Sequence, residues 1–476
     1  MIPVLRLILN QEQEAYLVGG YLRDSIAKIN TADIDICIVG HALPVAEAVA
    51  KLLNGTHIEL SKTRGIHRVV TTKDSMDIQV DFTSAYRGIS CDLANRDFTI
   101  NAIALPINQN TISQRSNVSD LIDPFNGITD INRNVLRMTS PKVFASDPIR
   151  LLRAIRLQQQ LELNIDPTTS KQITSDATRL ATASWERIRN EFLAIIAQDD
   201  AASALKTLDY HNLLDQIVPE MQATKHVEQP QEHYWDVFEH SIETVSNLER
   251  ILSHIPSDRM APTFDGANSY FDELIGDGHS RLTICKVASL LHDIAKPQTK
   301  TIDTTGRIRF LNHATEGALI SGRITNRLRM SRKVSLSIQG QILHHLRPSQ
   351  LAPQGKMPSR KAISRYYKDV GDVALDTLYL SIADHLAARG PHLDNAEWEH
   401  RCQTVKLILD ELHSINTAVK TKTLVTGHDI MERLSLKPGP HIGKLIDLVE
   451  EAQFDGKITD TSHRSHHGLA DTIQSR

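Results

Sequence analysis

Hydrophobic and polar positions follow two different periods along this chain. Before about residue 135, short apolar runs alternate with polar turns, which predicts strands at AYLVGG, DIDICIVG, HRVVTT and MDIQVDF. The segment PVAEAVAKLL predicts a helix between the second and third strands, and the opening residues MIPVLRLILN predict a helix before the first. We therefore expect a mixed α/β region at the start of the chain.

Helical periodicity dominates from Pro148 onward. The segments IRLLRAIRLQQQL, SWERIRNEFLAIIA and AASALKTLDYHNLL each repeat apolar residues every three or four positions. Residues 254–280, rich in Gly, Ser, Asp and Pro, predict a loop or insertion, after which helices are expected to continue to about Leu412. Two helices joined by a Pro-Gly-Pro turn should follow, then a polar tail after Asp460 that is expected to fray. The two periods together predict an α+β chain.

Length and composition narrow the class of protein. At very roughly 150 residues per domain, 476 residues suggest about three domains, and an aromatic content of 5% suits a helix-rich chain. The four cysteines are widely spaced and form no CxxC pair, as in a reduced, cytoplasmic protein. We find no run of 18 apolar residues and no signal-peptide cleavage site, so we expect no membrane association.

The net charge of −4 argues weakly against nucleic-acid binding, but a local basic surface can be hidden in that sum. One basic cluster recurs at helical spacing: Arg150, Arg153 and Arg156. A second occupies a short stretch: Arg323, Arg327, Arg329, Arg332 and Lys333. Taken alone, each cluster indicates only a solvated helix face.

A glycine pair follows the first predicted strand in the segment LVGGYLRD. Gly19 and Gly20 lie between that strand and a helix, with Arg23 and Asp24 in the first turn of the helix. Glycines at such a turn let the backbone approach a phosphate, and a helix N-terminus offers free N–H groups to it. Any tight strand-to-helix turn can use two glycines, so this signal is weak alone.

Two aspartates open the second predicted strand. Because side chains alternate along a strand, Asp33 and Asp35 should share one face while Ile34 points into the core. Paired carboxylates repel unless positive charge lies between them, and strand-edge charges in solvent are the simplest alternative. Divalent ions held by such a pair activate a hydroxyl and stabilise a leaving group, and Mg²⁺ prefers these oxygen ligands.

A third motif, NRDFTINA, is followed by DPFNG at residues 123–127. Arg96 could grip a triphosphate, while Asp97 and Asn101 could contact a ribose or organise the loop. In this order, GGxxRD, DxD, RDFTINA and DPFNG resemble the class II tRNA nucleotidyltransferase and bacterial poly(A) polymerase family, within the polymerase-β-like nucleotidyltransferase superfamily. The resemblance implies an enzyme that extends the 3′ end of tRNA with CTP and ATP, with Asp33 and Asp35 as catalytic ligands of Mg²⁺.

The resemblance continues at Asp147-Pro148-Ile149-Arg150, which is similar to the family's neck helix. There an acidic residue and an arginine one turn apart serve as a protein template for the incoming base, and an Asp and an Arg at i and i+3 share a helix face. Asp147 can accept from an exocyclic amine and Arg150 can donate to a ring atom. A surface salt bridge is the alternative. We assign Arg153 and Arg156 to nucleotide binding as well, and expect residues 184–189 to brace this helix.

The centre of the chain carries histidines and aspartates in the order H…HD…D. This order, with the segment HDIAKP, resembles the HD superfamily of metal-dependent phosphohydrolases, and the ligand set it implies is His240, His292, Asp293 and Asp384. His313 and one of His344 and His345 match the further histidines of binuclear members, and we favour His345. Imidazole suits Mn, Ni, Fe or Zn, so the metal stays undecided. Hydrolysis of a phosphoester is the expected chemistry.

The resemblance covers nearly the whole chain and predicts four domains: a nucleotidyltransferase head (1–135), a helical neck (136–225), an HD domain (226–412) and a C-terminal helical element (413–476). The turn Lys437-Pro438-Gly439-Pro440 in the last element could meet RNA or simply pack helices. Oligomeric state is not readable.

Two departures from the family keep narrower activities open. Position 95 is Asn where the family usually has Arg, and the connection into DLANRDF is short. CC-only addition, A-only addition and poly(A) synthesis therefore remain alternatives to full CCA addition. An HD phosphohydrolase with a non-catalytic head is the alternative from a different class, and the intact Asp33 and Asp35 pair argues against it.

Overall fold

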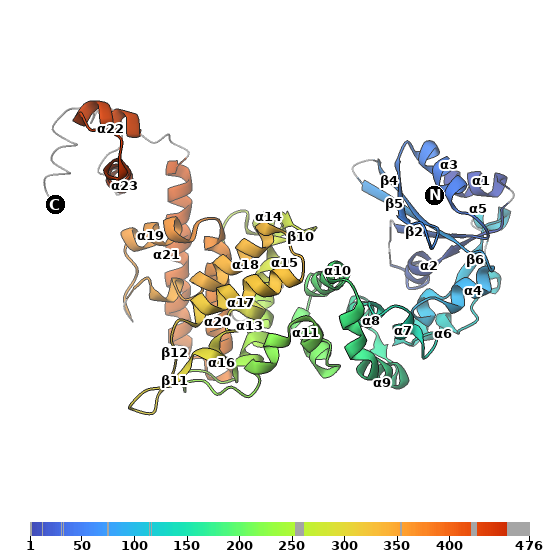
Figure 1. Ribbon diagram of the computed structural model, residues 1–476, viewed down its shortest axis with the longest axis horizontal. Coiled ribbons are helices and arrows are strands. Elements are labelled where there is room, and N and C mark those ends of the chain that lie inside the picture. Colours follow the sequence, from blue (N-terminus) through green and yellow to red (C-terminus); the bar gives the residue numbers. More distant parts are fainter. Residues whose placement is uncertain are drawn as a thin grey trace. The chain divides into compact units, whose positions relative to one another are not determined.

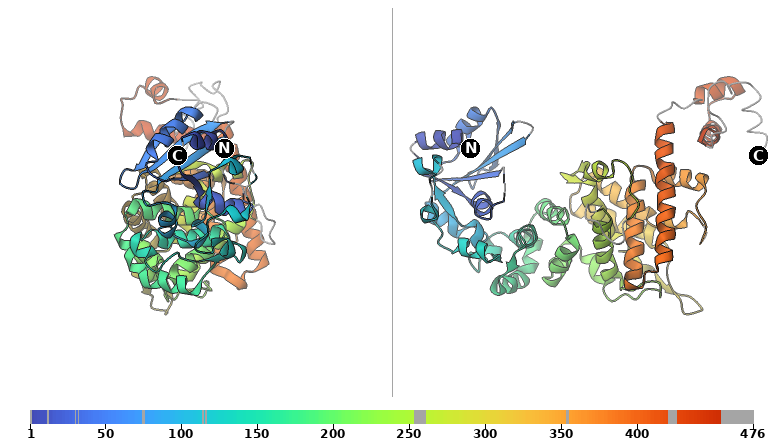
Figure 2. Two further views of the ribbon diagram at one scale, coloured as in Figure 1. Left: turned by 90° about the vertical axis from the view of Figure 1, so that its right-hand side faces the viewer. Right: turned by 180° about the vertical axis from the view of Figure 1, so that it is seen from behind.

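The computed structural model (Figures 1 and 2) describes residues 2–454 except 12, 30, 32, 74–75, 114, 116, 253–260, 353–354 and 420–425. The chain divides into two compact units. The first comprises the residues up to Gln198 together with Ser203–Pro219, and the second comprises Asp199–Ala202 and the chain from Glu220 onward. Each unit is described by itself.

The first unit begins with a mixed sheet and its helices. Its elements are α1 (Ile2–Asn10), β1 (Ala15–Val18), α2 (Gly19–Ile26), β2 (Asp33–Ile38), α3 (Leu43–Leu53), β3 (Thr56–Ser61), β4 (Ile66–Lys73), β5 (Met76–Ser84), α4 (Ile89–Ala94), η1 (Thr99–Asn101), β6 (Ala104–Pro106), α5 (Gln109–Ile112), η2 (Val118–Asp120), α6 (Gly127–Asn132) and β7 (Val135–Leu136). The strands and helices predicted for this region are confirmed, and β3, β6 and β7 are additions.

The sheet has the strand order β3-β4-β5-β2-β1-β6, in which β2 and β5 run parallel and the other neighbours run antiparallel. Alternation along β2 sends Ile34, Ile36 and Ile38 into one core cluster with residues of α1 and α3, which cover that face of the sheet (Figure 1). Asp33 and Asp35 therefore lie on the opposite face. The predicted separation of carboxylates from isoleucines is confirmed.

The rest of the first unit is helical. Its elements are α7 (Val143–Ser146), α8 (Arg150–Gln160), β8 (Asn164–Ile165), α9 (Pro167–Asp176), η3 (Ala177–Thr182), α10 (Trp185–Ile196), α11 (Ala201–Tyr210) and α12 (Leu214–Ile217). Leu151, Leu152 and Ile155 line the buried stripe of α8, which packs against α10. The short strands β7 and β8 pair in parallel.

The second unit is almost wholly helical. Its elements are η4 (Pro219–Thr224), α13 (Val237–Leu252), α14 (Ala267–Asp272), β9 (Leu274–Gly276), β10 (His279–Ser280), α15 (Arg281–Leu291), α16 (Lys296–Thr299), β11 (Lys300–Ile302), β12 (Ile308–Phe310), α17 (His313–Arg327), α18 (Arg332–His344), η5 (Pro348–Gln350), α19 (Arg360–Val370), η6 (Gly371–Val373), α20 (Ala374–Arg389), η7 (Gly390–His392), α21 (Asn395–Val419), α22 (Gly427–Leu434) and α23 (Pro440–Phe454). The mixed head sheet and these helices confirm the predicted fold class.

Helices α15 and α20 are buried on nearly every side, and α13 and α18 pack against both. A helix that is apolar all round belongs in a core, so these two helices form the centre of the second unit. The prediction of a loop at residues 254–280 was wrong in part, because the described portion contains α14 and the hairpin of β9 and β10. The two helices predicted around the Pro-Gly-Pro turn are confirmed as α22 and α23, which share their own small core.

Helix α21 runs through residue 412, where the sequence suggested a domain boundary, and the four predicted boundaries stay predictions. Among the described residues, none of the helices has the length and apolarity needed to cross a membrane. The tail after Asp460 lies outside the described residues.

Candidate active site and metal centre

The glycine turn is bonded to one of the predicted catalytic carboxylates. Strand β1 ends at Val18, and Gly19 adopts a positive φ of 67°. The backbone N–H of Gly20 donates to Asp35 Oδ2 at 2.9 Å. A Cβ on Gly19 would lie 2.8 Å from both Asp35 Oδ2 and Arg96 Nη1, so glycine is the residue that lets these two groups approach the turn.

A third carboxylate lies beside the predicted pair. Asp81 on β5 is the parallel register partner of Asp35, so it shares the sheet face of Asp33 and Asp35. Burial raises the pKa of Asp35, with Asp81 raising it further and the nearby Arg96 opposing the change. Asp81 was not predicted from the sequence. Its alternation within MDIQVDF was a usable signal, but nothing in the sequence shows that β5 lies next to β2.

The donor set of this face fits a hard divalent cation. Three aspartates supply carboxylate oxygens, which Mg²⁺ prefers, and their mutual repulsion would be relieved by a bound ion. Asp33 is exposed, and Asp35 and Asp81 are partly buried. The face is thus accessible to a substrate that carries phosphates.

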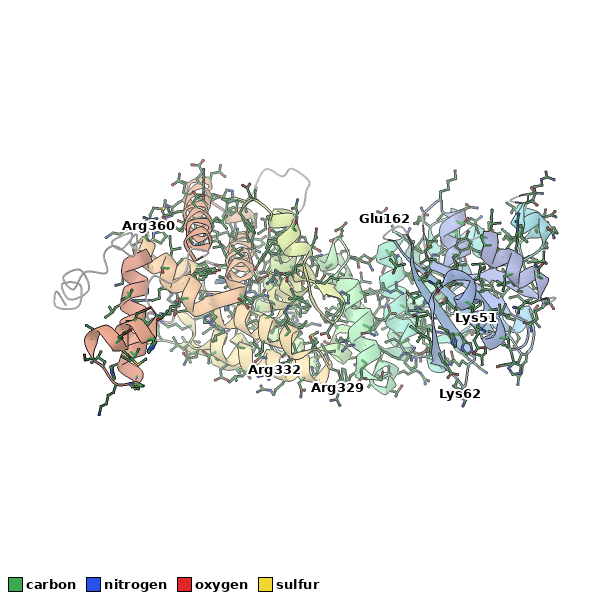
Figure 3. All side chains as sticks on the ribbon, turned by 90° about the horizontal axis from the view of Figure 1, so that it is seen from above. Lys51, Lys62, Glu162, Arg329, Arg332 and Arg360 are labelled. Carbon is green, nitrogen blue, oxygen red and sulfur yellow. The ribbon has the colours of Figure 1, made fainter. Side chains whose placement is uncertain are left out.

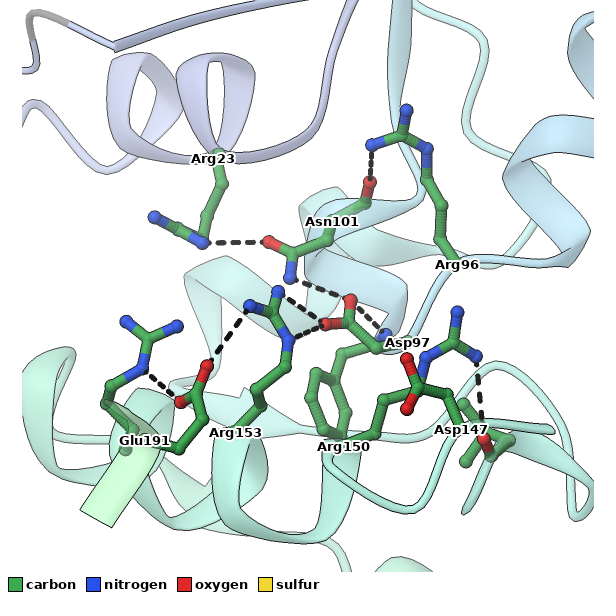
Figure 4. Close-up of polar contacts among 12 residues, drawn as sticks. Arg23, Arg96, Asp97, Asn101, Asp147, Arg150, Arg153 and Glu191 are labelled. Carbon is green, nitrogen blue, oxygen red and sulfur yellow. Dashed lines mark hydrogen bonds and ion pairs between the residues drawn. The ribbon is translucent and has the colours of Figure 1, made fainter. Parts of the chain in front are cut away.

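Two arginines border the same face from the α2 and α4 sides. Arg23 is buried and donates from Nη1 to Asn101 Oδ1 at 2.8 Å, while its Nε bonds Asp24 Oδ1 at 2.7 Å. Arg96 is held by Asp92, with Nε 2.8 Å from Oδ2, and its Nη1 reaches the carbonyl oxygen of Asn101 (Figure 4). Both guanidinium groups are therefore oriented before any nucleotide arrives.

Asp97 and Asn101 organise the loop that carries them. Asn101 Nδ2 donates to Asp97 Oδ1 at 2.9 Å, and Arg153 donates from Nε and Nη2 to Asp97 Oδ2 at 3.0 and 2.8 Å (Figure 4). Burial alone would raise the pKa of Asp97, but Arg153 and Asn101 outweigh it and hold this pKa well below its usual range. Of the two roles open for these residues, the contacts favour loop organisation.

Two of the arginines predicted to bind nucleotide, Arg153 and Arg156, both contact Glu191. Arg153 Nη1 lies 3.7 Å from Glu191 Oε1, and Arg156 Nε donates to Glu191 Oε2 at 2.7 Å. A chain of contacts thus runs from Arg23 through Asn101, Asp97 and Arg153 to Glu191 on α10 (Figure 4). Their assignment to nucleotide binding stays a prediction.

The predicted helix containing both Asp147 and Arg150 is wrong. Helix α8 begins at Arg150, and Asp147 is extended (φ −155°, ψ 100°), because Pro148 disfavours helical geometry in the residue before it. The two side chains also have other partners. Arg187 donates to both oxygens of Asp147 at 2.9 and 2.8 Å, and Arg150 Nη2 donates to the carbonyl of Asn95 at 2.7 Å.

Arg187 lies in the segment predicted to brace the neck, and its contact defines that brace. Burial alone would raise the pKa of Asp147, but the bidentate pair with Arg187 lowers it, so Asp147 is a fixed, ionised acceptor.

In the second unit, the structure brings together the residues predicted for the HD site. His240 Nε2 lies 3.0 Å from Asp384 Oδ1, 3.2 Å from His292 Nε2 and 3.4 Å from Asp293 Oδ2. Both histidines are fully buried. His240 on α13, His292 and Asp293 in the turn after α15, and Asp384 on α20 thus come together from distant parts of the sequence.

A second group of ligand atoms shares Asp293. Its Oδ1 lies 3.5 Å from His313 Nε2 and 3.9 Å from His345 Nε2, and these two nitrogens are 3.4 Å apart. Among the described residues of this centre, His240, His292 and Asp293 form one group that could hold an ion, and Asp293, His313 and His345 form another. His344 faces a different cavity, so the geometry favours His345.

Hydrogen bonds orient three of these imidazoles. The Nδ1 atoms of His292, His313 and His345 lie 2.8, 2.7 and 2.7 Å from the carbonyl oxygens of Ser289, Phe310 and Ile342. A carbonyl requires a proton on Nδ1, which leaves Nε2 as the metal-binding atom of the neutral ring. The chemistry of this donor set fits Mn, Ni, Fe or Zn.

Three cations and a histidine at this centre were not predicted from the sequence. Lys296 Nζ is 2.5 Å from Asp293 Oδ2 and donates to Gln229 Oε1 at 2.7 Å, and His233 packs against the ring of His240. A cavity of about 270 Å³ opens onto the cluster, lined by Lys296, Arg307, Arg309, His313, His345 and Asp384 among others. Lys296 stood in the motif HDIAKP, which was a signal, whereas the arginines arrive on the hairpin of β11 and β12.

The second basic cluster seen in the sequence is spread over helix ends. Arg327 pairs with Glu220 at 2.7 Å, and Arg329 and Arg332 are exposed where α17 ends and α18 begins (Figure 3). We assign no site to this cluster.

Family models match three parts of the chain. A poly(A) polymerase head domain matches residues 15–137, a probable RNA- and SrmB-binding site of polymerase A matches 162–224, and an HD domain matches 237–389. The chain is 30% identical over 452 residues to an A-adding tRNA nucleotidyltransferase of Deinococcus radiodurans, covering 93% of this chain and 92% of the relative. It is 25% identical over 454 residues to a CC-adding tRNA nucleotidyltransferase of Thermus thermophilus, covering 94% and 91%.

Solved structures share the fold. A CCA-adding enzyme in an apo form matches with a TM-score of 0.63 and 20% identity, over 99% of this chain and 92% of that chain. A Thermotoga maritima CCA-adding enzyme complexed with tRNA matches with a TM-score of 0.60 and 20% identity, over 100% and 94%. At this identity the likeness shows a common fold.

Proposed function

The chain belongs to the tRNA nucleotidyltransferase family, and we propose that it builds or repairs the 3′-terminal CCA of tRNA from CTP and ATP. The observation that carries this proposal is the face formed by Asp33, Asp35 and Asp81, with the Gly19–Gly20 turn and Arg96 beside it. A nucleotidyl transfer needs hard oxygen ligands for metal and a separate group that binds the triphosphate, and these residues support both roles.

Within this proposal, the three aspartates hold Mg²⁺, and Arg96 and Arg23 bind the triphosphate near the glycine turn. Ions held there would help to activate the 3′-hydroxyl and to stabilise the leaving pyrophosphate. The protein's own part is to orient the phosphates and to hold the carboxylates at the spacing set by β2 and β5.

Base selection is assigned to Asp147 and Arg150. Asp147 is held as an acceptor by Arg187, which suits an exocyclic amine of C or A, and Arg150 Nη1 stays beside Ser146 Oγ at 3.2 Å as a donor. U and G present a carbonyl where C and A present the amine, so this pair disfavours them.

A product-length assay tests the proposal. A tRNA transcript ending before CCA is incubated with Mg²⁺ and CTP, ATP, both or neither, and the products are separated on a sequencing gel. Extension by CC with CTP and by one further A with both nucleotides supports full CCA addition. Addition that stops at CC, a single A on a CC-ended tRNA, or a long A ladder selects one of the narrower enzymes. No extension under any condition contradicts the proposal.

We infer a second activity, phosphoester hydrolysis, at the HD centre. The observation that favours it is the pair of ligand groups sharing Asp293, open to a cavity with Lys296, Arg307 and Arg309. An ion held by these residues would activate water for the hydrolysis of a phosphoester, and the three cations suit a phosphate. Candidate substrates are a cyclic nucleotide, a 2′-phosphate and a 2′,3′-cyclic phosphate. If His292→Ala and Asp293→Ala left hydrolysis of all three substrates unchanged, the assignment of this activity would be wrong.

An enzyme that extends tRNA ends would act in the cytoplasm, which is where we place this chain.

A further inference from the structure

Arg68 on β4 is bound to the third carboxylate of the head. Its Cα is the antiparallel register partner of that of Asp81, so both side chains lie on the face that carries Asp33 and Asp35. Nε and Nη2 of Arg68 donate to the two carboxylate oxygens of Asp81, each at 2.8 Å. This is the planar fork-to-fork geometry that gives the strongest arginine–carboxylate pairs.

The positive charge of Arg68 interacts with all three aspartates. Its hydrogen bonds to Asp81, and after them the negative charges of Asp81, Asp33 and Asp35, raise the pKa of Arg68. Three carboxylates on one sheet face repel one another unless a cation lies among them. Arg96 lies beside Asp35 at the Gly19 turn, which follows β1, whereas Arg68 is paired with Asp81 on β5.

A divalent ion bound by Asp81 would need the same oxygens and the same electrostatic position. Two cations sharing one carboxylate repel each other, and a carboxylate whose charge is already neutralised attracts a metal less. The side chains of Arg68 and Asp81 are 32% and 24% exposed, so the guanidinium can withdraw into water at small cost.

We propose that Arg68 is a built-in counter-cation that holds Asp81 and competes with divalent metal for it, thereby setting the metal concentration at which the head becomes active. The proposal rests on the proposed function, because it takes the three aspartates as the metal ligands of the head. Arg68 is a positioning residue that acts through Asp81. A purely structural ion pair predicts the reverse: without Arg68, Asp81 would be misplaced and metal would bind more weakly.

Mn²⁺ binding, followed by the loss of the free-ion electron paramagnetic resonance signal, tests the proposal without an activity assay. The full chain is used, with Asp293→Asn in every sample so that the HD centre contributes little signal. We expect Arg68→Ala to bind Mn²⁺ at the head about three- to tenfold more tightly, from the loss of one competing charge. Arg133→Ala is the matched control, since Arg133 is exposed in the same unit and lies at the C-terminal end of α6, outside the sheet. Unchanged or weaker binding in Arg68→Ala overturns the proposal.

A double-mutant cycle with Asp81→Asn shows whether Arg68 acts through Asp81. In that background Arg68→Ala should change the Mn²⁺ dissociation constant by less than about twofold. If Arg68→Ala raised the Mn²⁺ affinity equally with and without Asp81→Asn, Arg68 would act only through its long-range charge. That result would contradict competition at Asp81.

A stability measurement separates this inference from the proposed function. In the presence of a chelator, Arg68→Ala should lower the melting temperature, and added Mg²⁺ should raise it by more than in the parent protein. If the parent binds no Mn²⁺ at the head and Asp35→Ala changes nothing, the metal assignment of the proposed function has failed. If the parent binds Mn²⁺ and Arg68→Ala binds no better, the assignment stands and only the competition is wrong.

Discussion

The head and the HD centre differ in how exposed their charged groups are and in which elements set the spacing of those groups. In the head, the aspartates lie on an open sheet face, with Asp33 exposed, and their spacing comes from strand register. In the HD centre, His240, His292 and Asp293 are almost fully buried, and their spacing comes from packed helices. The open face suits a metal that arrives and leaves with a nucleotide, whereas the buried cluster suits an ion that stays with the protein.

The neighbouring cations differ in the same way. Arg68 beside Asp81 is about one-third exposed and can move away, while Lys296 beside Asp293 is buried and bonded to Gln229. A charge that can reach water costs little to unpair, and a buried one costs a great deal. Substitutions in the HD centre should therefore change stability most, and substitutions in the head should change activity most.

The largest stability effect is expected from Asp293→Ala. It leaves the Lys296 ammonium buried without its carboxylate, and removing one partner of a buried pair costs about 3–5 kcal/mol. Chemical denaturation of the second unit measures the change in the free energy of unfolding, and metal analysis should show a loss of bound transition metal. Adding Lys296→Met should recover part of the loss. A cost below about 1 kcal/mol would contradict the buried-pair account.

Gly19→Ala should damage nucleotide addition more than folding. A methyl group would lie 2.8 Å from Asp35 Oδ2 and Arg96 Nη1, so both must shift, and the positive φ costs about 1–2 kcal/mol. We expect tRNA extension to slow by about tenfold to a hundredfold, because catalytic groups displaced by about 1 Å lose activity of this order. Gly88→Ala is the matched control: its φ is 80° and nothing lies within 4 Å of a Cβ there. Equal activity in the two variants would exclude the clash.

Asp97→Asn should destabilise the first unit by about 1–3 kcal/mol, because the amide cannot satisfy Arg153 and Asn101 as the carboxylate does. The pKa of Asp97 is depressed in the folded protein, so its stabilising contribution is present above the unfolded value near 4 and is lost as the pH falls below it. Unfolding measured from pH 6 to pH 3 should show a smaller decline in the variant than in the parent. Parallel curves would contradict this role.

Arg187→Ala should have the smallest effect on stability, about 0.5–1 kcal/mol, because its side chain is half exposed. Freed from its partner, Asp147 should orient less well, and discrimination of CTP and ATP against UTP and GTP should fall by about tenfold, the value of one well-placed hydrogen bond. Single-nucleotide incorporation with each triphosphate measures it. Arg179→Ala, which removes another half-exposed pair in the same unit, should leave selectivity unchanged.

The sequence was informative wherever a local period or a motif placed a side chain. Alternation predicted that Asp33 and Asp35 share a face, and the motif order predicted the convergence of His240, His292, Asp293 and Asp384. Contacts set by distant register were not readable: Asp81 and Arg68 join the head site only because β5 lies beside β2 and β4 lies beside β5.

One prediction from local helical spacing was also wrong. Helical spacing suggested that Asp147 and Arg150 share a helix, but Pro148 keeps Asp147 extended, and Arg187, forty residues later in the chain, determines the orientation of its carboxylate.

The most direct test of the account is a double dissociation on one pair of full-length variants, Asp35→Ala and Asp293→Ala. Extension of a tRNA lacking CCA and hydrolysis of a 2′,3′-cyclic phosphate are measured on both, with circular dichroism confirming that each is folded. The account predicts that Asp35→Ala loses extension by a factor on the order of a thousand and keeps hydrolysis, while Asp293→Ala does the reverse. Extension that survives in Asp35→Ala, or that disappears in a folded Asp293→Ala, would contradict it.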